Sequence, residues 1–369
     1  MRSRLARIPA PDEAAARERA WHVVRTAYAE REPGPARRLR PWAVAAVAAG
    51  AIVIGAAVTS PGRAVLDSIR RAVGVEHAQP ALFSLPTRGR LLAVSPGGAW
   101  IVHADGSKRR LGDYVDATWS PFGHFVAAVT RNELRALELD GDVRWTLARP
   151  RIRSPRWGGS LTDTRIAYTS GDGLHVVAGD GTGDRLLAPA ERGPLAWRPG
   201  SAHDLAYVSA SELRLQDADS GTVLWRATLG AARPVTNLAW SRDGRRVLVV
   251  SPLDLVVFDA QGHERRRIAA RRQEFAAAAL SAQGRLAYVR RLRSGESEVR
   301  LGDGTRVFSG TGDFTDLTWS PDSRWLLVAW PTANQWVFVR VAGPRRIVAG
   351  GAIARQFGGA FPRAVFWCC

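Results

Sequence analysis

Short hydrophobic runs, each ended by a turn signal, recur along the chain from about residue 91 onward. The most regular stretch is 236–269, which divides into runs at 238–240, 247–250, 255–258 and 263–269. Apolar runs separated by turns rich in Gly, Pro and Asp predict a four-stranded antiparallel meander. Because positions 247–250 are all apolar, both faces of this sheet need to be covered by neighbours.

The same unit recurs along the chain, marked by a Trp, or once a Leu, that precedes a turn. The marker positions are Trp119, Trp157, Trp197, Trp240, Leu280 and Trp319, so successive units are 38 to 43 residues apart. Repetition at this period is typical of β-propeller blades, which stack side by side and cover one another. We expect these Trp side chains to fill the space between adjacent blades.

A seventh, shorter copy begins near Leu91 and has room for only three strands, at 90–95, 99–104 and 107–111. We expect the fourth strand from 364–367, since a ring closed by both chain ends leaves no open sheet edge. The sequence therefore predicts an all-β fold over 87–369. This fold is a seven-bladed β-propeller of four-stranded antiparallel blades, closed by a composite N/C-terminal blade.

The segment before the repeats predicts a membrane anchor. Residues 1–40 carry ten Arg and five acidic residues and predict a short cytoplasmic basic tail with a helix at about 11–31. Residues 42–58 contain no charge, and with their flanks (41–60) they reach the minimum length of a transmembrane helix. Forty preceding residues favour an uncleaved anchor over a signal peptide. We expect 61–86 to form a juxtamembrane helix and a linker.

The flanking charges predict the orientation of this span. Arg37, Arg38 and Arg40 precede it, and only Arg63 lies close after it. By the positive-inside rule the N-terminus is cytoplasmic and the propeller extracytoplasmic. The expected localisation is the cell (inner) membrane, with a single pass.

Composition narrows the classes of partner. The chain has 369 residues, 52 basic and 34 acidic, with a formal net charge of +18. All but one of the basic residues are Arg and they are spread along the chain, which argues against a nucleic-acid surface.

The two cysteines, Cys368 and Cys369, are adjacent and can close only a strained ring, so we expect no structural staple. Intermolecular pairing, or no bond, stays open.

One unit carries a resemblance to a known family. Residues 165–187, RIAYTSGDGLHVVAGDGTGDRLL, follow a Trp-containing turn and resemble the TolB-type propeller repeat, which is WD-repeat-like in fold. The resemblance extends over Leu91 to about Gly350 and implies extracytoplasmic protein contacts without catalysis. Two units, 139–148 and 217–230, are instead similar to quinoprotein-type propeller repeats.

No motif in the sequence indicates a catalytic or metal-binding site. Asp180 to Asp184 suggests a calcium loop but lacks the distal Glu, and its place between a third and a fourth strand favours a hairpin turn. There is no G-x-S-x-G motif, and the seven His have no paired-ligand spacing. We therefore predict no catalytic residue, no cofactor site and no metal site.

Two loops depart from the repeat pattern and supply the candidate contact residues. The turns between second and third strands are mostly short, but 290–296 is longer and basic, and 330–336 is flanked by Trp. Both fall on the same rim of adjacent predicted blades. Aromatic and Arg side chains are common in protein interfaces, so the predicted partner contacts are Arg290, Arg291, Arg293, Trp330 and Trp336.

Three functions remain open. The first is a membrane-anchored extracytoplasmic propeller that acts as a non-catalytic protein or ligand interaction module, with its protein partner on one propeller rim. The second is an anti-sigma-like transmembrane regulator, in which the N-terminal helix binds a cytosolic regulator and the propeller is the sensor. The third is a quinoprotein-like or other propeller enzyme.

Overall fold

The structure is a computed structural model that describes residues 78–79, 84–191, 193–201, 203–230 and 234–369. The predicted tail (1–40) and span (41–60) lie outside these residues, as does most of the predicted 61–86 segment. Within the described part of the chain, no helix has the length and apolar character needed to cross a membrane.

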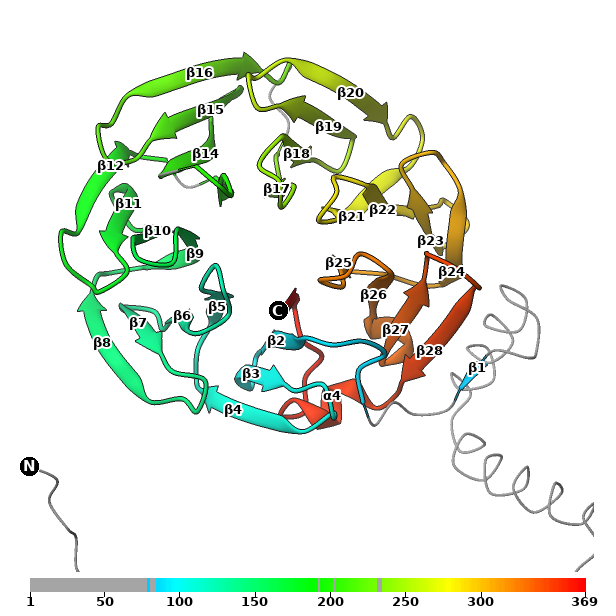
Figure 1. The fold of residues 1–369 in the computed structure, drawn as a ribbon. Coiled ribbons are helices and arrows are strands. Elements are labelled where there is room, and N and C mark those ends of the chain that lie inside the picture. The colour runs from blue at the N-terminus through cyan, green and yellow to red at the C-terminus, as the bar shows by residue number, and fades with distance from the viewer. Residues whose placement is uncertain (1–77, 80–83, 192, 202, 231–233) are drawn as a thin grey trace, which may run out of the picture. The chain divides into compact units, whose positions relative to one another are not determined.

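Seven blades, each with four antiparallel strands, are arranged in a ring around a central axis, and a short fifth strand joins the outer edge of one of them (Figure 1). Six of these blades are continuous in sequence. Blade 1 comprises β5 (Asp116–Trp119), β6 (Val126–Val129), β7 (Glu133–Leu137) and β8 (Val143–Ala148). Blade 2 comprises β9 (Arg153–Gly159), β10 (Thr164–Thr169), β11 (Gly173–Ala178) and β12 (Arg185–Pro189). Blade 3 comprises β13 (Leu195–Trp197), β14 (Asp204–Ser209), β15 (Glu212–Asp217) and β16 (Val223–Thr228).

The ring continues through three further blades of the same kind. Blade 4 comprises β17 (Asn237–Trp240), β18 (Arg246–Val250), β19 (Asp254–Asp259) and β20 (Glu264–Ala269). Blade 5 comprises β21 (Glu274–Leu280), β22 (Leu286–Arg291), β23 (Glu296–Leu301) and β24 (Arg306–Thr311). Blade 6 comprises β25 (Asp316–Trp319), β26 (Trp325–Trp330), β27 (Gln335–Arg340) and β28 (Arg346–Gly350), with the short 3-10 helix η2 (Pro331–Ala333) between β26 and β27. The four-residue helix α4 (Ile353–Gln356) follows blade 6.

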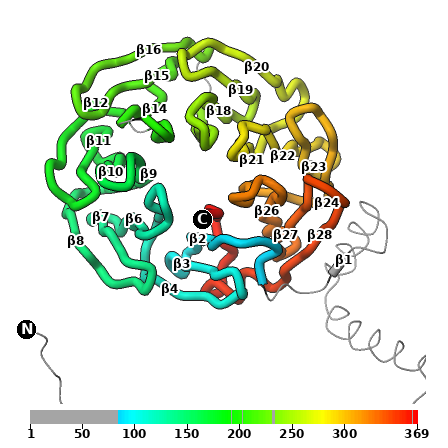
Figure 2. Tube along the Cα trace, viewed as in Figure 1, coloured from blue at the N-terminus to red at the C-terminus, as the bar shows by residue number. Residues whose placement is uncertain are grey.

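The composite blade closes the ring as predicted. It consists of β29 (Ala364–Cys368), β2 (Arg90–Ser95), β3 (Gly98–Val102) and β4 (Lys108–Gly112), in that order from the centre outward. The C-terminal strand β29 pairs antiparallel with β2, so Arg90 lies opposite Cys368 and Val94 opposite Ala364. The chain therefore ends at the centre of the ring, where Figure 2 shows the C-terminus beside β2.

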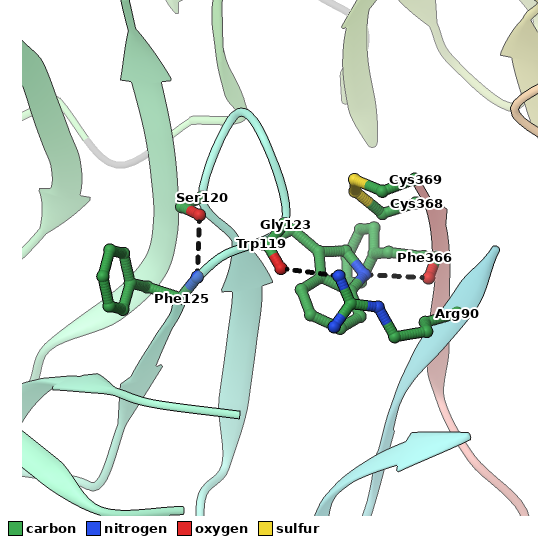
Figure 3. Close-up of a disulfide and its surroundings, with 8 residues drawn as sticks. All are labelled: Arg90, Trp119, Ser120, Gly123, Phe125, Phe366, Cys368 and Cys369. Atoms are coloured by element: carbon green, nitrogen blue, oxygen red, sulfur yellow. Dashed lines mark hydrogen bonds between the residues drawn. A yellow bond between two sulfur atoms is a disulfide. The ribbon is translucent and has the colours of Figure 1, made fainter. Parts of the chain in front are cut away.

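Side-chain hydrogen bonds join the composite blade to blade 1. The Trp119 Nε1–H donates to the Phe366 carbonyl at 3.2 Å, and Arg90 Nη2 donates to the Gly123 carbonyl at 2.9 Å (Figure 3). Figure 3 also shows Cys368 and Cys369 joined by a disulfide beside these contacts. The sequence left open an intermolecular bond or no bond, and the structure instead joins the two neighbouring cysteines to each other.

The core is divided among the boundaries between blades. The described residues form seven hydrophobic clusters, and each contains side chains from two adjacent blades. The middle strands are apolar on both faces for this reason, as in β18, where Val247 and Leu248 are fully buried. Outer strands such as β16 alternate between half-buried and exposed residues. Every blade is thus covered by its two neighbours, as the sequence of 236–269 requires.

One strand was not predicted. Ala78–Gln79 forms β1, which pairs parallel with Ile347 and Val348 of β28 at the outer edge of blade 6. We expected these two residues in a linker. Two residues are too few to show a strand pattern, and the open edge of β28 supplies the backbone partners.

Candidate functional site

The turns of the propeller lie on two rims. Rim A carries the turns that follow the first and third strands of each blade. Rim B carries the turns that follow the second strand, together with the connections from one blade to the next. Because the blades are rigid and packed on both faces, a ligand has access only to the rims, the central cavity and the outer strands.

The structure brings the two predicted contact loops together on rim B. The loops lie in adjacent blades 5 and 6. The connection between these blades bridges them, since Gly312 N donates to the Gly295 carbonyl at 2.8 Å and Asp313 N donates to Thr332 Oγ1 at 2.8 Å. The predicted adjacency of the loops is therefore correct.

The two predicted Trp side chains do not face solvent. Trp330 is only 1% exposed and packs edge-to-face against Phe308 and Phe314, and its Nε1–H donates to the Thr311 carbonyl at 3.1 Å. Trp336 is 4% exposed and packs against Phe357, which follows α4. Both rings belong to the core between blades, which corrects the expectation that they contact a partner.

The predicted Arg side chains lie at the surface of this region with different partners. Arg290 forms an ion pair with Glu298 at 2.8 Å, and Arg291 forms one with Asp313 at 2.8 Å. Arg293 is exposed. Burial opposes ionisation of Glu298, but hydrogen bonds from Arg300 and Arg290 outweigh it and lower its pKa to about 2. A contact role for these three Arg stays a prediction.

A more open surface lies on rim A between blades 1 and 2. This cleft has a volume of about 430 Å³ and is formed by the turns 120–125, 160–164 and 179–180 with strands β7, β8 and β9. We call it the aromatic cleft. Its lining includes the side chains of Pro121, Phe122, Phe125, Trp145, Trp157 and Leu161.

The aromatic cleft exposes apolar side chains at its mouth. Leu161 is 71% exposed and Phe122 is 40% exposed. The floor is rigid, because Phe125 stacks on Trp157 with ring centroids 6.1 Å apart and carries the Arg144 guanidinium 4.8 Å above its ring. Exposed apolar groups beside a fixed aromatic floor are typical of surfaces that bind another apolar group.

A departure from the repeat pattern at Phe122 marks this cleft in the sequence, although we did not predict it. In blades 4 and 6 the turn after the first strand holds Asp243 and Asp322, whose carboxylates accept hydrogen bonds from the turn's Ser hydroxyl and from a backbone N–H. Blade 1 has Phe122 at that position. Formation of the turn does not require a large apolar residue at this position, because a carboxylate there would stabilise the turn.

The central cavity opens beside the C-terminal strand and has a volume of about 430 Å³. Asp316 and Arg156 line it, together with Cys368 and Cys369. Both Asp316 oxygens already accept backbone hydrogen bonds, from Leu317 N and Val365 N at 2.8 Å each. This carboxylate therefore fastens β29 to blade 6.

The described residues contain no group of three His, Cys, Asp or Glu side chains arranged as a metal site. The sequence 180–184 forms the turn between β11 and β12, and Asp180 accepts hydrogen bonds from Thr182 N and Oγ1 at 3.0 and 2.7 Å. Asp184 instead accepts from the Tyr168 hydroxyl at 2.5 Å. The interpretation as a hairpin turn is confirmed.

Comparison with known proteins supports the fold. No family model matches the sequence, and no curated protein matches it. A chain of the mitotic checkpoint complex superposes with a TM-score of 0.55 at 16% identity, covering 72% of this chain and 90% of that one. The β-propeller domain of Cps50 (Swd1) from Myceliophteria thermophila gives a TM-score of 0.51 at 14% identity, covering 68% and 96%.

A third similar structure is a candidate 6-phosphogluconolactonase from Bacteroides uniformis, with a TM-score of 0.53 at 15% identity, covering 76% of this chain and 99% of that one. At such identities the likeness shows the fold alone. These comparisons do not support the resemblance to TolB-type repeats. The chain is a seven-bladed β-propeller.

Proposed function

We propose that the protein is a non-catalytic interaction scaffold that binds a segment of a partner protein in the aromatic cleft of rim A. The observation that carries this proposal is the pairing of the exposed side chains Phe122 and Leu161 with a rigid aromatic floor. Burying a Leu or Phe side chain contributes roughly 1.5 to 3 kcal/mol, which makes such a cleft a favourable anchor point.

The charge of the protein indicates the chemistry of the partner. The formal net charge is +18, and Arg144 lies over the cleft floor. A segment with one bulky apolar residue flanked by Asp or Glu would place the apolar group in the cleft and its carboxylates near Arg144. Complementary charge raises the association rate and disfavours basic partners.

The same proposal includes a membrane tether. The uncharged stretch 42–58 and the Arg residues before it support a single span at 41–60 with the propeller extracytoplasmic. Fusing a reporter that is active only in the cytoplasm after Cys369 should give no signal. Activity of that reporter would overturn the orientation without affecting the cleft proposal.

Peptide selection tests the cleft directly. We expect a random heptapeptide library selected against the full-length chain to yield sequences with a bulky apolar residue next to Asp or Glu. Leu161→Glu should weaken binding of these peptides at least tenfold, because it places a charge at the mouth of the cleft and repels acidic neighbours. Fluorescence anisotropy of a labelled selected peptide measures this change.

Two further variants separate binding from folding. Phe122→Asp introduces the residue that blades 4 and 6 have in the same turn. The turn should therefore form, while the apolar side chain at the mouth of the cleft is lost. Leu224→Glu changes a side chain that is 48% exposed on outer strand β16 and should leave binding unchanged. Selected peptides that bind all three variants as tightly as the unmodified chain would contradict the proposal.

A further inference from the structure

A second cleft on rim A has the same position between its blades as the aromatic cleft but the opposite chemistry. It lies between blades 4 and 5, has a volume of about 620 Å³ and is formed by the turns after β17, β19, β21 and β23. We call it the arginine cleft. Five Arg line it, accompanied by only two carboxylates, Asp259 and Asp303; the five are Arg245, Arg246, Arg265, Arg266 and Arg285.

Among the described residues that line the cleft, one Arg forms an ion pair, and the charge of a second, Arg285, acts on the Asp303 carboxylate. Arg265 forms an ion pair with Asp259 at 2.6 Å. Asp303 accepts a hydrogen bond from Thr305 N at 2.8 Å, which closes its own turn. Five guanidinium groups and two carboxylates give the lining of the cleft a net charge of +3, and the Asp243 carboxylate in the turn after β17 also interacts with Arg245 and Arg246.

Two of the Arg are fixed in place by the neighbouring blade. Arg246 Nη1 donates to the Gly284 carbonyl at 3.2 Å, and Arg266 Nη2 donates to the Gly302 carbonyl. A carbonyl orients a guanidinium but does not neutralise it. These two side chains therefore contribute a fixed positive field and also hold blades 4 and 5 together.

The remaining two Arg of the cleft, Arg285 and Arg245, have weaker contacts. Arg285 lies over the Trp319 ring, with its guanidinium carbon 5.3 Å from the ring centroid. Arg245 lies in the turn after β17, where its backbone N–H and its charge both act on the Asp243 carboxylate. Both side chains are exposed, and among the described residues neither guanidinium donates a hydrogen bond to a neighbouring blade.

From this arrangement we propose that the arginine cleft binds the phosphoryl group of a phosphate ester. Arg245 and Arg285 donate to the phosphoryl oxygens, while Arg246 and Arg266 stabilise the dianion through their charge. Guanidinium groups match the geometry of phosphate oxygens and form paired, charge-assisted hydrogen bonds with them. This site is separate from the aromatic cleft and does not depend on the proposed partner.

Isothermal titration of the full-length chain with inorganic pyrophosphate in 0.15 M NaCl tests the site. The double variant Arg245→Gln/Arg285→Gln keeps the two Arg that bond to blade 5 and should bind pyrophosphate at least tenfold more weakly. The matched control Arg226→Gln/Arg272→Gln removes the same charge from exposed positions on outer strand β16 and on rim B. It should bind like the unmodified chain.

Each outcome decides the proposal. Equal affinity of all three proteins, or equal weakening in both double variants, would overturn it, since binding would then follow net charge alone. Selective weakening in Arg245→Gln/Arg285→Gln would support it. Co-sedimentation with vesicles that contain phosphatidic acid distinguishes the source. If the unmodified chain binds these vesicles and Arg245→Gln/Arg285→Gln does not, the ligand is a lipid headgroup. If the unmodified chain binds pyrophosphate but not the vesicles, the ligand is a soluble phosphate ester.

Discussion

At the scale of single residues, Asp316 shows how ring closure depends on a carboxylate. It is the first residue of β25, and its oxygens accept hydrogen bonds from Leu317 N and from Val365 N of the C-terminal strand. Burial disfavours the charged form more than these bonds favour it, and the pKa of Asp316 rises to about 6. The carboxylate that fastens β29 is therefore costly to ionise in the folded protein.

This raised pKa predicts a pH dependence of stability. Between about pH 4 and pH 6 the folded protein keeps a proton on Asp316 that the unfolded chain has lost, so its contribution to stability falls as pH rises through this window. Asp316→Asn removes this contribution. The difference in free energy of unfolding between the unmodified chain and the variant should fall by at most about 3 kcal/mol from pH 4 to pH 6. Urea denaturation at several pH values measures it.

The comparison is made as a difference because other carboxylates titrate as well. Asp259 and Glu298 have pKa values lowered to about 2, and their contributions are lost as pH falls below the ordinary range. Their titration changes the free energy of unfolding of the unmodified chain and of Asp316→Asn by the same amount. Curves of stability against pH that run parallel for the unmodified chain and Asp316→Asn would show that Asp316 is not perturbed.

At the scale of elements, one register position on the outer strands links neighbouring blades. Trp145 on β8 donates from Nε1 to the Gly179 carbonyl of blade 2, and Trp225 on β16 donates to the Ala260 carbonyl of blade 4, each at 3.0 Å. Arg109, Arg185 and Arg266 occupy the equivalent positions of β4, β12 and β20 and also donate to carbonyls of the next blade. Adjacent blades are thus joined at their periphery as well as in their core.

The contact made by Trp225 predicts that substitution of Gly262 lowers the stability of the protein. Gly262 has a φ of +85°, and a Cβ there would lie 2.8 Å from the Trp225 ring. Gly304 has a φ of +91° in the equivalent turn of blade 5, but a Cβ there would point into open space with no atom within 4 Å. Gly262→Ala should therefore lower the free energy of unfolding by about 1 to 3 kcal/mol more than Gly304→Ala. Guanidinium denaturation of both variants measures the difference.

The two variants share the cost of placing Ala at a positive φ, so their difference isolates the clash with Trp225. Equal destabilisation of both proteins would mean that the Trp225 ring moves aside without cost. That result would contradict the description of Trp225 as a fixed link between blades 3 and 4.

Strand positions could be predicted from sequence, whereas contacts between blades could not. In 236–269 the predicted strands agree with β17 to β20 within one residue, because turns with Gly and Asp interrupt runs that are buried on both faces. The links made by Trp145 and Trp225 end on backbone carbonyls, which every residue has, so no residue type marks the partner. Trp330 looked like a loop residue because it borders a turn, yet its ring fills the space beside Phe314.

At the scale of the whole molecule, stability depends on the strand that joins the two ends of the propeller. β29 pairs with β2, accepts a hydrogen bond from Trp119 of blade 1 and donates one to Asp316 of blade 6. Val365 of this strand is 2% exposed. Without β29 the edge of β2 is open and two interfaces between blades lose part of their core.

Removing residues 364–369 should therefore lower the free energy of unfolding by more than about 4 kcal/mol, through lost burial and an exposed edge. A synthetic peptide of residues 361–369 added to the truncated chain should restore its melting temperature, and a scrambled peptide should not. The control Cys368→Ser/Cys369→Ser keeps the strand without the disulfide and should melt close to the unmodified chain. A truncated chain as stable as the full chain would contradict closure by β29.

The function proposed for the molecule places partner binding on rim A. Hydrogen–deuterium exchange of the full-length chain with and without a selected peptide tests this most directly. The account predicts protection in 120–125, 160–164 and 179–180, the turns that form the aromatic cleft. Protection confined to 290–296 and 331–334 on rim B, or no protection on rim A, would contradict it.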